Sequence, residues 1–285
     1  MKTEPVIKVN SLTKEFSLPH EKFSTAKQRF VNVFTRKSYE NFMALNNVSF
    51  EIEKGEFFGI IGSNGSGKST LLKILAKIYQ PSKGSVEIKG RVAPFIELGV
   101  GFNPELTARE NVFLNSAILG LSKKETEKKF AEIIKFAELE NFVDQKLKTF
   151  YSGMKVRLAF AIAIQAHTEI LLVDEVLAVG DANFQQKCFD VFRKLKGEKK
   201  TIVFVSHALN IIEEFCDRVA LIDKSRLISI GKPRNVINDY LSIITDKETR
   251  GMEVSEKGKS KKEERWGDGQ AEIVDLWFEN IKGAK

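Results

Sequence analysis

The sequence contains few residues of the types that disulfide scaffolds and metal sites need. It has two cysteines, three histidines and six prolines in 285 residues. Cys188 and Cys216 lie far apart in segments with helical patterns, so we expect two reduced, buried thiols. The histidines, His20, His167 and His207, show no metal-ligand spacing. A disulfide framework and a zinc site are therefore both excluded as the basis of the fold.

Long apolar runs are also missing. The densest, Leu158–Ile164, has seven residues, whereas a membrane-spanning helix needs roughly 18. The opening residues, MKTEPVIKVN, lack the apolar core of a signal peptide. With 42% hydrophobic and 29% charged residues, the composition predicts a globular protein that stays in the cytosol unless a partner holds it at a membrane. The net charge of +7 is too small to choose among nucleic acid, an anionic membrane and a phosphate ligand.

Residues 62–70 carry the strongest chemical signal. They match the phosphate-binding pattern G-x-x-x-x-G-K-[ST], after an apolar run, FFGII, and before a helical one. Glycines let backbone N–H groups turn toward phosphate oxygens, and the start of a helix adds partial positive charge. We expect the lysine to reach the β- and γ-phosphates and Ser69 to bind Mg²⁺. The predicted phosphate-binding residues are Gly62, Ser63, Asn64, Gly65, Ser66, Gly67, Lys68, Ser69 and Thr70.

A second signal is the apolar run 170–173, which ends in Asp174 and Glu175. In an open α/β sheet, ligands bind at the carboxyl ends of the strands. We expect Asp174 to hold Mg²⁺ and Glu175 to polarise an attacking water. Taken alone, the pattern equally fits a strand that ends in a solvated turn. Together with residues 62–70 it indicates a nucleotide-hydrolysing site.

The order of elements predicts an α/β fold with a P-loop core and a mainly parallel sheet. Strands are expected at 6–16, at 44–61 as a pair around a turn at Lys54-Gly55, at 170–173 and at 201–205. A helix is expected at 70–79, and the helical periodicity from 106 to 165 predicts an inserted helical subdomain. Residues 20–37 form an additional helical pattern with Phe23, Ala26, Phe30 and Phe34 on one face and several basic residues, suited either to the sheet edge or to a membrane partner.

A third signal, residues 151–155 (Tyr-Ser-Gly-Met-Lys), opens an apolar helical run 22 residues before Asp174, counted from Ser152. Alone it fits a helix whose N-cap is Ser152. With the other two signals the chain resembles ABC-type ATPases, whose fold adds an antiparallel β-subdomain. The resemblance implies that Ser152, Gly153, Met154 and Lys155 contact the ATP of a second copy. It also implies that Asp181 occupies the D-loop position and that His207 senses the γ-phosphate.

Two family positions are less clear in this sequence. The family's glutamine before the helical subdomain is absent, and Glu97 is the candidate replacement, placed to reach Mg²⁺ or its water. Phe16 is the best candidate to stack on adenine, with Tyr39 and Phe42 as alternatives. A carboxylate at position 97 adds negative charge, which predicts slow or partner-dependent turnover.

Within the family, the runs 95–114, 151–163 and 173–188 resemble the ATP-binding subunits of polysaccharide exporters. That resemblance implies a homodimer that binds ATP and Mg²⁺ and drives export of a lipid-linked polysaccharide through a separate integral membrane permease. The subunit would then lie at the cytoplasmic face of the inner membrane. We expect an ATP-binding domain at 1–244, with its helical subdomain at about 103–165, and a charged linker at 245–264. Residues 265–285 resemble the start of a carbohydrate-binding β domain, as in a chain cut shortly after the linker; a natural short chain is the alternative.

Two other classes remain open. One is a non-transport ABC ATPase acting on nucleic acid or ribosomes, which the basic balance favours. The chain has one P-loop and no heptad run, so we expect no nucleic-acid partner. The other is a P-loop kinase for a small molecule, which Ser152-Gly153 and His207, at their spacings from Asp174, argue against.

Overall fold

The computed structural model describes residues 4–19, 39–95, 101–165, 168–174 and 181–258. The chain divides into two units, 1–240 and 241–285. The strands are β1 (Pro5–Pro19), β2 (Tyr39–Glu53), β3 (Phe57–Ile61), β4 (Lys83–Ile88), β5 (Val92–Phe95), β6 (Ile170–Asp174), β7 (Thr201–Val205), β8 (Arg218–Asp223) and β9 (Arg226–Gly231). The helices are α2 (Lys68–Leu75), α3 (Ala108–Ile118), α4 (Lys123–Ala137), α5 (Ser152–Ile164), α6 (Ala182–Gly197), α7 (Leu209–Phe215) and α8 (Pro233–Gly258), with short 3-10 helices η1 (Glu140–Phe142) and η2 (Leu147–Thr149).

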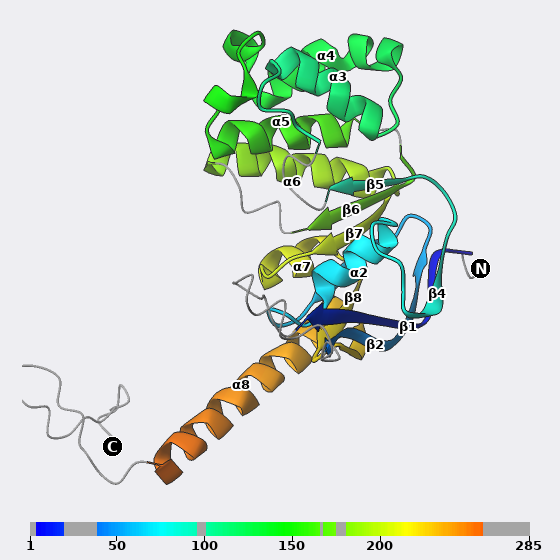
Figure 1. Ribbon diagram of the computed structural model, residues 1–285, viewed down its shortest axis with the longest axis vertical. Helices are drawn as coiled ribbons and strands as arrows, with labels where there is room; N and C mark the ends of the chain where they lie inside the picture. Colours follow the sequence, from blue (N-terminus) through cyan, green and yellow to red (C-terminus); the bar gives the residue numbers. More distant parts are fainter. Residues whose placement is uncertain (1–3, 20–38, 96–100, 166–167, 175–180, 259–285) are drawn as a thin grey trace, which may run out of the picture. The chain divides into compact units, whose positions relative to one another are not determined.

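The larger sheet has six strands in the order β5-β6-β7-β3-β8-β9. The first five are parallel, and β9 pairs antiparallel with β8. All residues of β3 and β7 are buried, as expected for central parallel strands covered on both faces. The predicted α/β class with a mainly parallel sheet is therefore confirmed (Figure 1).

The register of this sheet determines which residues meet at its carboxyl edge. Asp174 of β6 lies opposite Val205 of β7, and Val205 lies opposite Ile60 of β3. The segments that follow these three strands begin with Glu175, Ser206 and Gly62. Three signals that are far apart in the sequence therefore converge on one edge of the sheet.

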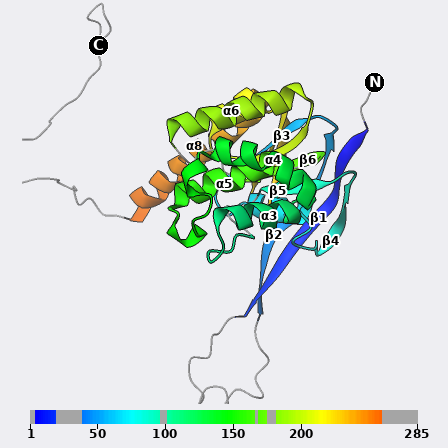
Figure 2. The same cartoon turned by 90° about the horizontal axis from the view of Figure 1, so that it is seen from above.

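The smaller sheet is antiparallel, with the order β2-β1-β4. The long strands β1 and β2 run side by side, and their pairing extends as far as Pro19 opposite Tyr39 (Figure 2). The turn predicted at Lys54-Gly55 joins β2 to β3. The additional helix predicted at 20–37 lies outside the described residues.

The helical subdomain consists of α3, α4 and α5, beyond the edge strand β5 (Figure 1). Thr107 and Ser122 form capping boxes at the starts of α3 and α4, each with a glutamate three residues later. The apolar faces of the three helices share one buried cluster that includes Leu158 and Ile162 of α5. Phe160, on the same helix, instead packs against Phe95 of β5 and connects the subdomain to the sheet.

One detail differs from the sequence-based expectations, because the predicted helix at 70–79 begins at Lys68 and ends at Leu75. Residues 245–258, part of the predicted charged linker, continue α8, and Tyr240 is the last residue of the first compact unit. The predicted domain boundaries remain predictions. None of the helices in the described ranges is long and apolar enough to cross a bilayer.

Candidate functional site

The loop between β3 and α2 has the backbone of a phosphate-binding loop. Gly62 and Gly67 both have positive φ angles, 150° and 111°. A Cβ atom at Gly62 would lie 1.9 Å from the carbonyl oxygen of Ile222, and one at Gly67 would lie 2.3 Å from that of Ala44. Any side chain at these positions would force the loop away from β8 or β2. The glycines therefore let the loop lie tightly between two strands.

Lys68, the first residue of α2, points into this loop. Its side chain is buried, and its Nζ donates hydrogen bonds to the carbonyl oxygens of Gly62 and Ser63, each at 2.9 Å. The helix has Gly67 as its N-cap and no side-chain cap. Its first N–H groups are thus left for a ligand, and the ammonium group lies beside them. This arrangement fits a phosphate group.

The remaining predicted loop residues divide by exposure. Asn64, Gly65 and Ser69 are exposed, Thr70 is half-buried and Ser66 is buried. Ser69 follows Lys68 at the open end of α2, where a hydroxyl can reach a cation bound to phosphate. The exposed residues are thus accessible to a nucleotide, and Ser66 belongs to the base of the loop.

Asp223 and Ser225, which were not predicted from the sequence, hold the phosphate-binding loop in place through hydrogen bonds. The hydroxyl of Ser63 donates to Asp223 Oδ1 at 2.8 Å, and the N–H of Ser225 donates to the carbonyl oxygen of Ser66 at 3.2 Å. Ser225 also donates its hydroxyl to Met43 of β2 at 2.7 Å. The turn after β8 therefore joins the phosphate-binding loop to β2. A carboxylate after an apolar run is the only sequence signal for Asp223, and the strand before it was not predicted.

Asp174 and His207 lie on the same edge of the sheet as the loop. Asp174 is the half-buried last residue of β6. His207 is exposed, two residues after the end of β7, and the preceding Ser206 is buried with its hydroxyl accepting the N–H of Ala208 at 3.1 Å. Glu175 and Glu97 lie outside the described residues, so their predicted roles remain predictions.

The donor set also bears on Mg²⁺. Within the described ranges, no group of three or more histidine, cysteine, aspartate or glutamate side chains could hold a metal ion. Mg²⁺ commonly uses one or two protein oxygens, with water and substrate phosphates completing its shell. Ser69 and Asp174 supply oxygens of that kind, so the residues present fit a magnesium ion that arrives with a nucleotide.

Phe16, the predicted adenine-stacking residue, lies in β1 directly opposite Phe42 of β2. Its half-buried ring packs edge-on against Tyr79 with a centroid distance of 5.5 Å. The ammonium group of Lys14 lies 4.9 Å from the ring centroid. Phe42 is 48% exposed. Phe16 and Phe42 thus occupy one point of the smaller sheet and differ in how firmly they are held, whereas the third candidate, Tyr39, begins β2 opposite Pro19.

Helix α5 begins within the predicted signature segment. Its N-cap is Tyr151, which is 65% exposed, and no side chain caps the helix. Ser152 is therefore the first helical residue and is exposed, with Gly153 and Lys155 half-buried. The Met154 side chain is buried in the cluster of the helical subdomain, so only the backbone of this residue is suited to contact a nucleotide. The exposed helix start fits the approach of an anion.

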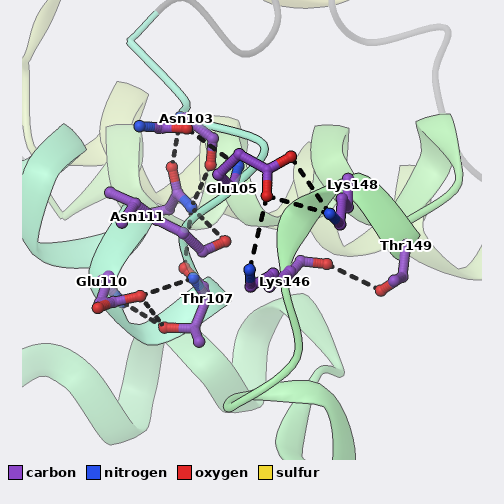
Figure 3. A network of polar contacts seen from close by, with 9 residues as sticks. Asn103, Glu105, Thr107, Glu110, Asn111, Lys146, Lys148 and Thr149 are labelled. Atoms are coloured by element: carbon purple, nitrogen blue, oxygen red, sulfur yellow. Dashed lines mark hydrogen bonds and ion pairs between the residues drawn. The ribbon is translucent and has the colours of Figure 1, made fainter.

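A polar network fixes the segment that precedes this helix start (Figure 3). The fully buried Asn111 of α3 accepts the N–H of Asn103 at 2.7 Å and donates its amide hydrogens to Asn103, Leu106 and Thr107 carbonyl oxygens. Two backbone bonds then join this loop to η2, from Lys148 to Pro104 and from Leu147 to Leu106. Glu105 pairs with Lys146 and Lys148. Residues 103–107 are therefore held against η2, which ends three residues before the start of α5.

Asp181, predicted at the D-loop position, caps α6. Its Oδ1 accepts the N–H of Phe184 at 2.9 Å, and its other oxygen pairs with Arg157 of α5. The hydrogen bond from Phe184, and then the positive charge of Arg157, hold the pKa of Asp181 below its usual value. Within the described residues, both carboxylate oxygens of Asp181 thus bind groups of the protein: one caps α6 and the other pairs with Arg157.

Comparison with known proteins agrees with this geometry. Residues 45–178 match the family described as ABC transporter. The chain is 43% identical over 240 residues to the O-antigen export system ATP-binding protein RfbB of Klebsiella pneumoniae, covering 83% of this chain and 98% of that protein. It is 38% identical over 258 residues to the teichoic acids export ATP-binding protein TagH of Bacillus anthracis, covering 90% of this chain and 46% of that protein. A solved dimeric ATP-binding cassette, in a post-hydrolysis state bound to ADP and Pi, matches with a TM-score of 0.65 and 26% identity over 80% of this chain and 98% of the other.

The chain therefore belongs to the ABC transporter family, in which it is an ATP-binding subunit and an ATPase. Within the family it is similar to the ATP-binding proteins of polysaccharide and teichoic acid export systems. The resemblance predicted from the sequence motifs is confirmed.

Proposed function

We propose that this chain dimerises on ATP and drives export of a lipid-linked, O-antigen-like polysaccharide through a separate membrane permease. The observation that carries the proposal is the coexistence of two anion-suited helix starts in one chain. One is α2 with Lys68 in its loop, and the other is the exposed, uncapped start of α5 on the helical subdomain. The similarity to O-antigen export ATP-binding proteins supports the choice of cargo.

The two helix starts suggest a shared site. In a head-to-tail dimer, Lys68 and its loop in one copy would hold the phosphates, and the start of α5 in the other copy, with Ser152, Gly153 and Lys155, would add donors. Each nucleotide would then contribute to the contact between copies, so that its hydrolysis opens the dimer. Asp181, one residue beyond the undescribed segment 175–180, would lie near this contact.

The chain's own residues would divide the chemistry. Mg²⁺ would be held by Ser69 and Asp174, with Glu97 as a further candidate, and would neutralise phosphate charge. Glu175 would orient and polarise the attacking water. His207, exposed beyond β7, would donate to the terminal phosphate and so make the edge of the sheet sensitive to its loss.

The direct test is Glu175→Gln, which keeps the size of the side chain and removes the charge that polarises water. We expect ATP hydrolysis to be abolished while ATP binding is retained, so that an ATP-bound dimer accumulates and is visible by size-exclusion chromatography. A variant that hydrolyses ATP at the wild-type rate would contradict the role of Glu175. A wild-type chain that neither hydrolyses ATP nor dimerises with it would contradict the function itself.

The cargo needs a separate experiment. The chain should co-purify with an integral membrane permease, and the ATPase of that complex in lipid vesicles should rise when a lipid-linked polysaccharide is added. Double-stranded DNA and ribosomes are the matched alternatives in the same assay. Stimulation by either of these, with none by the glycolipid, would favour the non-transport class. The complex would lie at the cytoplasmic face of the membrane, where ATP is available.

A further inference from the structure

Arg157 of α5 is the centre of a cluster of charges that joins three helices. Its Nη1 lies 2.6 Å from Oε2 of Glu138, the residue that ends α4, and its Nη2 pairs with Asp181, the N-cap of α6. Lys187 of α6 pairs with the second oxygen of Glu138. The cluster thus alternates in sign from α6 through α5 to the end of α4 and back to α6.

The burial of Arg157 distinguishes this cluster from the ion pairs on the surface. Its side chain is only 13% exposed, whereas those of Asp181 and Glu138 are 58% and 43% exposed. A charge withdrawn from water is costly unless it is paired, so the guanidinium depends on its two carboxylates. Its planar group also lies 5.2 Å from the ring centroid of Phe184. A lysine has one point charge and cannot make this two-sided contact.

Asp181 extends the contact toward the nucleotide site. One of its oxygens caps α6 through the N–H of Phe184, and the other holds Arg157. In sequence, Asp181 lies six residues after Glu175, and Arg157 lies five residues after Ser152. One short polar bridge therefore connects the helix that begins with Ser152 to Asp181, the first described residue after Asp174.

We infer that Arg157 is a positioning residue that fixes the start of α5 relative to Asp181, and that the rate of ATP hydrolysis depends on this contact. This inference rests on the proposed function, in which the start of α5 serves the nucleotide held by a second copy. Within the described residues the contacts of the Arg157 side chain are with Glu138, Asp181 and Phe184, so it acts through α5 and α6 and not on the phosphate-binding loop 62–70. Its loss should therefore lower the rate of hydrolysis and leave the binding of ATP to a single copy intact.

The test compares Arg157→Met and Arg157→Lys with the wild-type chain. For Arg157→Met we expect kcat to fall about tenfold or more, with KM and the affinity for a fluorescent ATP analogue within about twofold. Arg157→Lys should retain part of the rate, because it keeps the charge and loses the fork. The control is Arg109→Met, which breaks an exposed pair with Asp144 and should leave kcat within about twofold.

A double-mutant cycle separates positioning from simple stability. Arg157→Lys and Asp181→Asn should lower kcat non-additively, with the double variant within about twofold of the worse single variant, because both break one contact. This cycle also decides the question if Arg157→Met does not fold. A folded Arg157→Met with the wild-type kcat, or additive losses in the cycle, would overturn the inference. A wild-type chain without ATPase would instead reject the proposed function, so the two failures are distinguishable.

Discussion

The hydroxyl of Ser63 donates a hydrogen bond to the carboxylate of Asp223 at a distance of 2.8 Å, although 160 positions separate the two residues. Asp223 ends β8 and is 7% exposed. The next two residues, Lys224 and Ser225, both have positive φ angles, 46° and 68°, and form the turn that also holds Ser66. The shape of the phosphate-binding loop therefore depends on a turn in the last third of the chain.

We predict that Asp223→Ala weakens ATP binding without removing any phosphate contact. The loop loses an acceptor for Ser63, and a hydrogen bond to a charged group contributes about 1.5–3 kcal/mol. Without this hydrogen bond the loop is less ordered before ATP binds, and part of the binding free energy is then used to order it. We therefore expect KM for ATP to rise about tenfold. Isothermal titration with ATP and steady-state ATPase assays measure both quantities.

Asp223→Asn is the matched control, because its amide oxygen still accepts from Ser63. It should keep KM within about threefold of the wild type. Ser63→Ala should reproduce the effect of Asp223→Ala, and the double variant should add little to either. Independent, additive effects of the two substitutions would show that the contact does not control the loop.

A shared site makes a second prediction. Lys68→Ala removes the ammonium group of one half-site, and Ser152→Glu places a negative charge where the other half-site would meet phosphate. Each variant alone should lack ATPase. A heterodimer of the two has one intact combination, so an equal mixture should recover about a quarter of the wild-type rate after subunit exchange. An inactive mixture, with exchange demonstrated by labelled subunits, would argue against the head-to-tail arrangement.

The parts of the fold that the sequence predicts are those whose signal is local. β6 and β7 are short apolar runs, and residues 62–70 carry a recognisable pattern, so their convergence at one sheet edge followed from the parallel arrangement. β5 was missed because it has four residues and contains Pro94, which edge strands tolerate. β8 was missed because its apolar run lies among helical patterns. β9, which pairs with β8, was missed with it.

The same division applies to the candidate site. Lys68 and Asp174 are identified by their neighbours in sequence, and the structure brings their segments together. Asp223 has only the weak signal of a carboxylate after an apolar run, and Arg157 has no local pattern, because the importance of both arises from contacts with residues 160 and 24 positions away. Met154 shows the opposite case, since its place in the signature pattern suggested a ligand contact and its side chain packs in the core.

The two thiols should be unreactive in the folded protein. Cys188 and Cys216 are buried, and burial raises the pKa of the Cys188 thiol to about 12. The thiolate is the form that reacts with iodoacetamide, so we expect no labelling at about pH 8 in the native state. Mass spectrometry after labelling in guanidinium chloride should show both sites modified. Rapid native labelling of Cys188 would contradict its burial.

Phe160 should be among the most important residues for stability. It is 2% exposed and packs against Phe95, Phe136, Phe184 and Phe192 at centroid distances of 5.6–6.1 Å. It thus joins α5 to β5, α4 and α6. Replacing a buried phenylalanine with alanine costs about 3–5 kcal/mol, which chemical denaturation measures directly. Phe142→Ala is the control, since Phe142 is 37% exposed and should cost about 1 kcal/mol or less.

The last prediction concerns which aromatic ring holds the adenine. Phe16 and Phe42 are opposite each other across β1 and β2, so a base could stack on either, and Tyr39 at the start of β2 is the third candidate. Tyr79 and Lys14 already restrain the ring of Phe16, and a restrained ring loses less conformational entropy when a ligand binds. We therefore expect Phe16→Ala to weaken ATP binding by about 1–3 kcal/mol, the contribution of one base–aromatic stack. Phe16→Tyr should retain affinity, and Phe42→Ala should change it by about threefold or less. Titration of ATP and of ribose triphosphate against each variant separates stacking from phosphate contacts. Only ATP carries a base, so loss of a stacking ring should weaken the binding of ATP and leave that of ribose triphosphate unchanged. If Phe42→Ala alone abolishes the preference for ATP, the adenine stacks on β2 and Phe16 serves only to pack Tyr79.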